Sequence, residues 1–148
     1  MWDISYMASS TFITLLLGLI LGNLIQGLPF NEKHEFTGDL LTFFNPYAIL
    51  IAVTTLSLFM MHGAIYLTMK TENRLYAKLT VLVNNCCKFF ILCFILTSMA
   101  TLIYIPHMTH EFKRSPWLFI LPLGAVLTVL NLKRNIDSRK YFTAFVFS

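Results

Sequence analysis

Charged side chains are scarce in this chain. Only 12% of its 148 residues are Asp, Glu, Lys or Arg, against about 25% in an average soluble domain. Hydrophobic residues make up 57% and include 14 Phe and 7 Met, more than the interior of a soluble domain of this length can hide. The composition excludes a water-soluble domain and predicts an integral membrane protein.

Motifs of the common enzyme classes are missing as well. The sequence contains no P-loop, no GxSxG, no HExxH and no CxxC. The long apolar stretches contain no Asp or Glu, so the chain alone cannot build the carboxylate relay that most proton pathways through membranes use. Its net charge of +4 comes from short basic clusters between apolar stretches, which does not indicate nucleic-acid binding. We expect any catalysis to reside mainly outside this chain.

Cysteine is also rare, and its positions do not favour disulfide bonds or metal binding. The three cysteines, Cys86, Cys87 and Cys93, fall inside one apolar stretch. Their spacing is not that of metal ligands, and they do not lie in an extracellular loop where disulfides form. We therefore expect buried, reduced thiols.

Long apolar stretches in the sequence predict where the chain crosses the membrane. A helix needs about 20 apolar residues to cross a hydrocarbon core about 30 Å thick. We predict spans at about residues 4–28, 46–69, 79–105 and 115–132, and the start of a fifth at 141–148. The expected fold class is all-α, a polytopic transmembrane helix bundle that forms one domain over residues 1–148. Because the fifth stretch is about a third of a spanning helix, we expect an interior fragment of a longer protein. The first span lacks a basic start and is too long for a cleaved signal peptide.

Basic residues between the spans predict the topology. Seven of them follow the second and fourth spans: Lys70, Arg74, Lys78, Lys133, Arg134, Arg139 and Lys140. The loops on the other side carry only Lys33, Lys113 and Arg114. The positive-inside rule therefore places the amino terminus in the cytoplasm.

Small and amide residues in the first span predict a close helix contact. Gly18, Gly22 and Gln26 repeat every four residues and share one helix face, with Asn23 beside them. Further candidates for helix packing or a subunit interface are Gly27, Asn45 and Pro46. A ligand-binding role is possible for this face, but ordinary helix packing is favoured because such small-residue patterns are common in membrane helices.

Two ionisable side chains lie at membrane depth. His62, in the second predicted span, is a candidate haem ligand, although a neutral His hydrogen-bonded to a neighbouring helix is favoured. Lys88, in the third, either pairs with a carboxylate from an absent subunit or segment, or extends its stem toward the cytoplasmic interface, which is favoured.

His107, His110 and Glu111 form a third candidate, in the outer loop after the third span. They could make a loose metal site if that loop were helical. Solvated surface residues are the favoured interpretation.

Several motifs in order carry a resemblance to a known family. Four motifs follow one another along the chain: WDISY, GLILGNLIQGLPF, FTGDLLTFFNPYAIL and TTLSLFMMHGAIYLTMKTE. A fifth motif, AFVFS, stands near the end. Together they resemble subunit II of cytochrome bd-type ubiquinol oxidases, over its fourth to seventh helices and the opening of the eighth. The family's amino-terminal GFD-type and HWDGNEVW-type motifs have no counterpart here. Lys88 and the short loop at residues 106–115 depart from the family pattern.

The resemblance implies a function in aerobic respiration at the bacterial inner membrane. The complex would oxidise quinol and reduce dioxygen to water, with haems b and d held by a larger partner subunit and no cofactor bound by this chain. In some members a structural quinone accompanies subunit II. The partners implied are the large haem-containing subunit I, membrane lipid and quinone, without nucleic acid.

A different class of function remains as an alternative. A small multi-pass transporter or a membrane assembly factor would have a similar composition. A transporter is expected to show broken helices in matched inverted halves, and the predicted spans contain no such matched pair.

Overall fold

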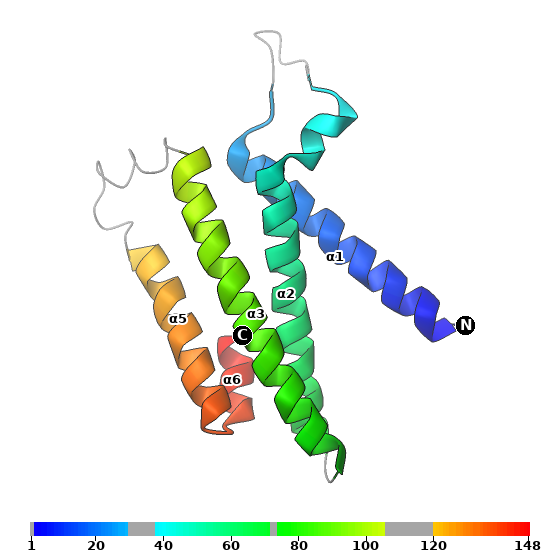
Figure 1. Ribbon diagram of the computed structural model, residues 1–148, viewed down its shortest axis with the longest axis vertical. Helices are drawn as coiled ribbons and strands as arrows, with labels where there is room; N and C mark the ends of the chain where they lie inside the picture. Colours follow the sequence, from blue (N-terminus) through cyan, green and yellow to red (C-terminus); the bar gives the residue numbers. More distant parts are fainter. Residues whose placement is uncertain (1, 30–37, 72–73, 106–119) are drawn as a thin grey trace. The chain divides into compact units, whose positions relative to one another are not determined.

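The computed structural model describes residues 2–29, 38–71, 74–105 and 120–148. These residues are helical, without a strand among them. Figure 1 shows the elements in chain order. They are α1 (Trp2–Gln26), the 3₁₀ helix η1 (Leu40–Phe44), α2 (Pro46–Lys70), α3 (Arg74–Tyr104), α5 (Ile120–Asp137) and α6 (Tyr141–Phe147). The all-α prediction is confirmed.

Three of these helices are long and apolar enough to cross a membrane. They cover Trp2–Gln26, Pro46–Lys70 and Leu75–Tyr104, and at 1.5 Å per residue each exceeds a hydrocarbon core of about 30 Å. The fourth predicted span overlaps α5, which has 18 residues, but its first five residues lie outside the described part. Within the described residues, the predicted count of four spans and the start of a fifth is therefore not reached.

The carboxyl end of α1 is set by a glycine. Gly27 has a φ of 89°, a left-handed conformation that glycine adopts without a Cβ penalty. Its N–H donates to the carbonyl of Asn23 at 3.0 Å, which is the single-bond form of a glycine helix cap. The helix therefore ends at Gln26, two residues before the predicted span ends, and Pro29 follows the cap.

The described chain divides into two compact units. The first contains Met1–Leu56 and Cys93–Ile105, that is, α1, η1, the start of α2 and the end of α3. Its core consists of Tyr47, Ile51 and Ile105, with Ala100 packed against them. Two hydroxyl pairs join α2 to α3 in this unit: Tyr47 with Thr101 at 3.0 Å, and Thr54 with Thr97 at 2.6 Å.

The second unit contains Ser57–Leu92 and Pro106–Ser148. In its described part, α5 and α6 form a helical hairpin joined at residues 138–140 (Figure 1). Tyr141 at the start of α6 donates a hydrogen bond to Thr80 of α3 at 3.4 Å and meets the ring of Tyr76 edge-on at 6.0 Å. The amino-terminal part of α3 is thereby tied to α6.

The turn between α5 and α6 has a regular hydrogen-bond pattern. Lys140 N–H donates to Asn135 at 2.9 Å, and Arg139 N–H donates to Ile136 at 3.0 Å. These two bonds define a Schellman motif, whose left-handed position is usually glycine. Here that position is Arg139, with a φ of 55°.

Candidate functional site

In the first unit, α1 crosses α2 in close contact at Gly18 and Gly22. A Cβ built on Gly22 would lie 2.5 Å from the Cα of Ala48, and one built on Gly18 would overlap the Cα of Ala52. Both clashes involve backbone atoms, which cannot move aside as a flexible side chain can. The two glycines therefore allow the helix backbones to touch, which is how small residues act in membrane helices.

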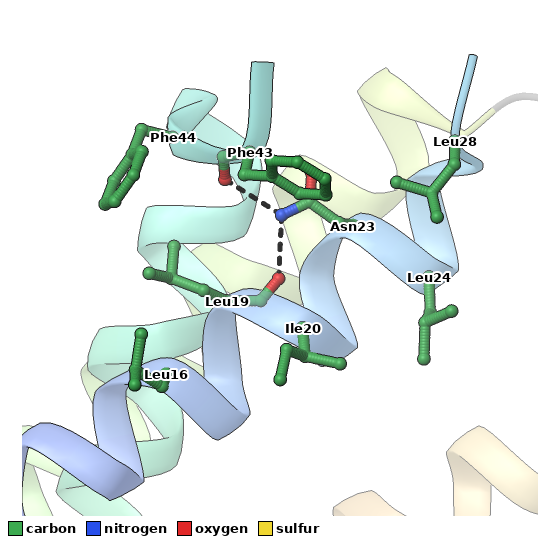
Figure 2. A pocket seen from close by; sticks show the side chains of 8 residues that line it. All are labelled: Leu16, Leu19, Ile20, Asn23, Leu24, Leu28, Phe43 and Phe44. Atoms are coloured by element: carbon green, nitrogen blue, oxygen red, sulfur yellow. Dashed lines mark hydrogen bonds between the residues drawn. The ribbon is translucent and has the colours of Figure 1, made fainter. Parts of the chain in front are cut away.

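Asn23 lies beside this crossing and is 6% exposed. Its Nδ2 donates to the carbonyl of Leu19 and to that of Phe43, both at 2.8 Å, as Figure 2 shows. Its Oδ1 accepts from Nδ2 of Asn45 at 2.9 Å. The amide thus has partners for both hydrogens and for its oxygen, which meets the requirement for a buried polar group. It ties α1 to η1 and to the residue that precedes α2.

Asn45 and Pro46 begin α2. Asn45 is the N-cap, because its Oδ1 accepts from the backbone N–H of Ala48, three residues on, at 2.7 Å. Pro46 occupies the first helical position, where its fixed φ suits the helix and its missing N–H costs nothing. Asn45 therefore both starts α2 and bonds to Asn23 of α1.

Two hollows flank the asparagine pair within the first unit. An apolar groove of about 230 Å³ opens beside Asn23 (Figure 2). Seven apolar residues line it with Asn23: Leu16, Leu19, Ile20, Leu24, Leu28, Phe43 and Phe44. A second, more polar hollow of about 410 Å³ is lined by Asn23, Gln26, Gly27, Leu28, Pro29, Thr42 and Asn45.

Gln26 and Gly27 therefore lie at the polar hollow. Gln26 is exposed although it follows Gly18 and Gly22 in the four-residue repeat. Gly27 has open space around its Cα, because a Cβ built there would meet no atom within 4 Å. Neither residue takes part in the backbone contact of α1 with α2.

His62 belongs to the second unit. Its Nδ1 lies 2.7 Å from the hydroxyl of Ser148, and its ring centroid is 4.5 Å from that of Phe145. The hydroxyl of Ser148 also donates to the carbonyl of Phe145 at 2.9 Å. His62 thus lies at hydrogen-bond distance from the residue that follows α6.

Lys88 lies on an exposed face of α3. Among the described residues it makes neither an ion pair nor a hydrogen bond. The three cysteines of the same helix are free and buried.

Metal ligands are not clustered in the described part of the chain, where no group of three or more His, Cys, Asp or Glu side chains meets. His107, His110 and Glu111 lie outside the described residues.

The residues that contact the two glycines were not among those predicted from the sequence. Ala48 and Ala52 are four residues apart on α2, and both are buried. This spacing is itself a small-residue pattern of the kind that marks helix contacts, so the signal was present. The hydroxyl pairs of α2 with α3 carried no comparable signal, because threonine also bonds to its own helix backbone, as Thr54 does to Leu50.

The long apolar helices and their close, amide-fastened crossing define a polytopic membrane protein built by helix packing. The family described as cytochrome bd terminal oxidase subunit II matches residues 1–148. The chain therefore belongs to the cytochrome bd oxidase subunit II family, and with its apolar helices it is a bacterial membrane protein.

Curated relatives agree with this membership. The chain is 27% identical over 180 aligned positions to cytochrome bd-I ubiquinol oxidase subunit 2 of Escherichia coli K12, covering 100% of this chain and 47% of the relative. It is 40% identical over 78 residues to a probable cytochrome oxidase subunit 2 of Haemophilus influenzae, covering 50% of this chain and 21% of the relative. The chain thus spans at most about half the length of these relatives.

Proposed function

We propose that this chain is the interior part of subunit II of a membrane-bound, cytochrome bd-type quinol oxidase. In that complex it supports a larger subunit that carries haems b and d. Two quinols are oxidised to two quinones while one dioxygen is reduced to two waters. The observation that carries the proposal is the family match over all 148 residues.

The described contacts support a structural role for this chain. The glycine crossing and the Asn23–Asn45 bond fix α1 against α2 through backbone contact and fully paired amides. Asp and Glu are absent from the three candidate spans beyond Asp3 at the start of α1. Proton and electron transfer are therefore assigned to other parts of the complex, and this chain acts as scaffold.

The apolar groove beside Asn23 supports a finer proposal. Its lining of leucine, isoleucine and phenylalanine side chains suits an isoprenoid tail, so a structural quinone is proposed to lie there. Solvent extraction of the washed, purified complex tests this. About one quinone per complex is expected, and a quinone-free, fully active complex would contradict it.

The topology proposed is an amino terminus in the cytoplasm. Lys70 stands in the last turn of α2, while Lys133 and Arg134 stand in the last two turns of α5. A cysteine at Lys140 should react with an impermeant thiol reagent only after the cytoplasmic side is opened. If the reagent labelled this cysteine in intact cells or spheroplasts from outside, the orientation would be the opposite of the one proposed.

Deletion of the gene for this subunit tests the main proposal. Membranes from the deletion strain should lose haem d absorbance and quinol oxidase activity, because the partner subunit needs this subunit in order to retain both. The gene supplied in trans should restore both. Unchanged oxidase spectra and activity in the deletion strain would contradict the proposal and favour the alternatives of a transporter or an assembly factor.

A further inference from the structure

The turn between α5 and α6 carries a concentrated positive charge. Its eight residues, 133–140, contain four basic side chains and one acidic side chain, which gives a net charge of +3. All five side chains are exposed: Lys133, Arg134, Asp137, Arg139 and Lys140. Among the described residues none of the five forms an ion pair. The charge of the turn is therefore not neutralised within this part of the chain.

The turn lies where two apolar segments end. The described part of α5 is uncharged up to Leu132, and all seven residues of α6 are uncharged. A helical hairpin with apolar arms and a charged turn is expected to place its arms in the hydrocarbon and its turn among the lipid headgroups. At that depth the phosphates of anionic lipids surround a membrane protein and attract its basic residues.

Buried side chains hold the turn in place. Leu132 and Ile136 of α5 and Tyr141 and Ala144 of α6 are each at most 7% exposed. The Tyr141 hydroxyl also bonds to Thr80 of α3, and the Schellman hydrogen bonds close the backbone of the turn. A ligand that binds the basic side chains therefore does not have to order the backbone that carries them.

Arg139 is the residue of the turn that best suits a phosphate group. Its φ of 55° lies in the left-handed region, where glycine would be more stable, and strained residues of this kind cluster at functional sites. Its guanidinium group is close enough to Tyr76 of α3 to interact electrostatically. The rings of Tyr76 and Tyr141 meet edge-on at 6.0 Å, and tyrosine is enriched at headgroup level. A guanidinium presents paired N–H groups that match two phosphate oxygens.

We propose that the α5–α6 turn binds the phosphate of an anionic phospholipid. Arg139 donates to two phosphate oxygens, and Lys140 supplies a second positive charge. Phe142 and Val146 of α6, exposed and four residues apart on one helix face, contact an acyl chain of the same lipid. The inference goes beyond the proposed function, because it needs neither the haem-bearing partner nor a reaction.

The test uses the complete subunit, as purified from its membrane with any partner that it retains, after bound lipid has been removed in detergent. Phosphatidylglycerol, phosphatidylcholine with the same acyl chains and inorganic phosphate are titrated separately, and the thermal unfolding midpoint is measured. Phosphatidylglycerol should raise the midpoint, and the other two should give no comparable rise. No rise with phosphatidylglycerol, or an equal rise with either of the others, would overturn the proposal.

Single substitutions locate the site. Arg139→Gln should weaken the apparent affinity for phosphatidylglycerol about tenfold, because a charge-assisted hydrogen bond is lost. Arg139→Gly should weaken it to the same extent, although this variant relieves the backbone strain. Lys70→Gln, in the last turn of α2, is the matched control; it should weaken the affinity by less than about threefold, because a charge that does not contact the phosphate is screened.

Three results with these variants would contradict the site. Unchanged affinity in Arg139→Gln would show that Arg139 does not bind the lipid. Equal weakening by Arg139→Gln and Lys70→Gln would show that the positive charge acts diffusely and not at the turn. If Arg139→Gln lowered the unfolding midpoint in the absence of lipid, Arg139 would be paired with another protein segment, such as the remaining part of this subunit.

Discussion

At the scale of the residue, the asparagine pair shows how a membrane protein keeps polar groups at a helix contact. Asn23 and Asn45 are bonded to each other and to backbone groups of α1, η1 and α2. The sequence singled out Asn23, because amides in apolar stretches are expected to bond across helices, and it named Asn45 as a further candidate for helix packing or a subunit interface. It did not indicate that Asn45 would also cap α2, since that role depends on where the helix begins.

Asn23→Leu should destabilise the protein by about 1 kcal/mol, because the Phe43 carbonyl and the Asn45 amide lose their partner. The measurement is the thermal unfolding midpoint of the purified complex in detergent. Asn131→Leu is the matched control, since exposed Asn131 bonds, among the described residues, only to Leu127 of its own helix. Equal midpoints for the two variants would contradict the role of the network.

Gly22→Ala should lower the free energy of unfolding by about 1–3 kcal/mol. The added methyl group meets the Ala48 backbone and pushes α1 away from α2. Gly63→Ala is the control, since a Cβ at Gly63 meets no atom within 4 Å; that variant should change stability by at most about 0.5 kcal/mol. Thermal unfolding of both variants in one detergent checks the difference. A Gly22→Ala protein as stable as Gly63→Ala would show that the helices do not touch there.

At the scale of the element, hydropathy predicted the positions of the helices but not their ends. The first predicted span runs to residue 28, whereas α1 ends at Gln26 because Gly27 takes a left-handed conformation. The predicted fourth span stops before Lys133, whereas α5 continues to Asp137. Charged residues end the apolar stretch without ending the helix, since Lys and Arg are good helix formers.

Arg139→Gly should stabilise the α5–α6 hairpin by about 1 kcal/mol, because Arg139 has a φ of 55° in the left-handed region. Lys140→Gly is the matched control, because it removes the same charge at a φ of −89° and should slightly destabilise the hairpin. The thermal unfolding midpoints of the two variants should move in opposite directions. A fall with Arg139→Gly would contradict the Schellman turn.

At the scale of the whole molecule, the sequence indicated an all-helical membrane protein of this family, and both conclusions stand. The interior of the packing was harder to predict. Gly18 and Gly22 were candidates for a subunit interface as well as for helix packing, and their contacts are with this chain's own α2. A single sequence shows that a face is made of small residues, but it cannot show which helix covers that face.

This chain is proposed to act as a scaffold for a haem-bearing partner. The most direct measurement is affinity purification of the complete subunit from membranes containing both subunits, followed by a reduced-minus-oxidised difference spectrum. We expect one larger subunit to copurify with haem b and haem d signals, and we expect no haem signal when the subunit is expressed without that partner. A haem spectrum from the subunit purified alone, or no copurified haem protein from the pair, would contradict it.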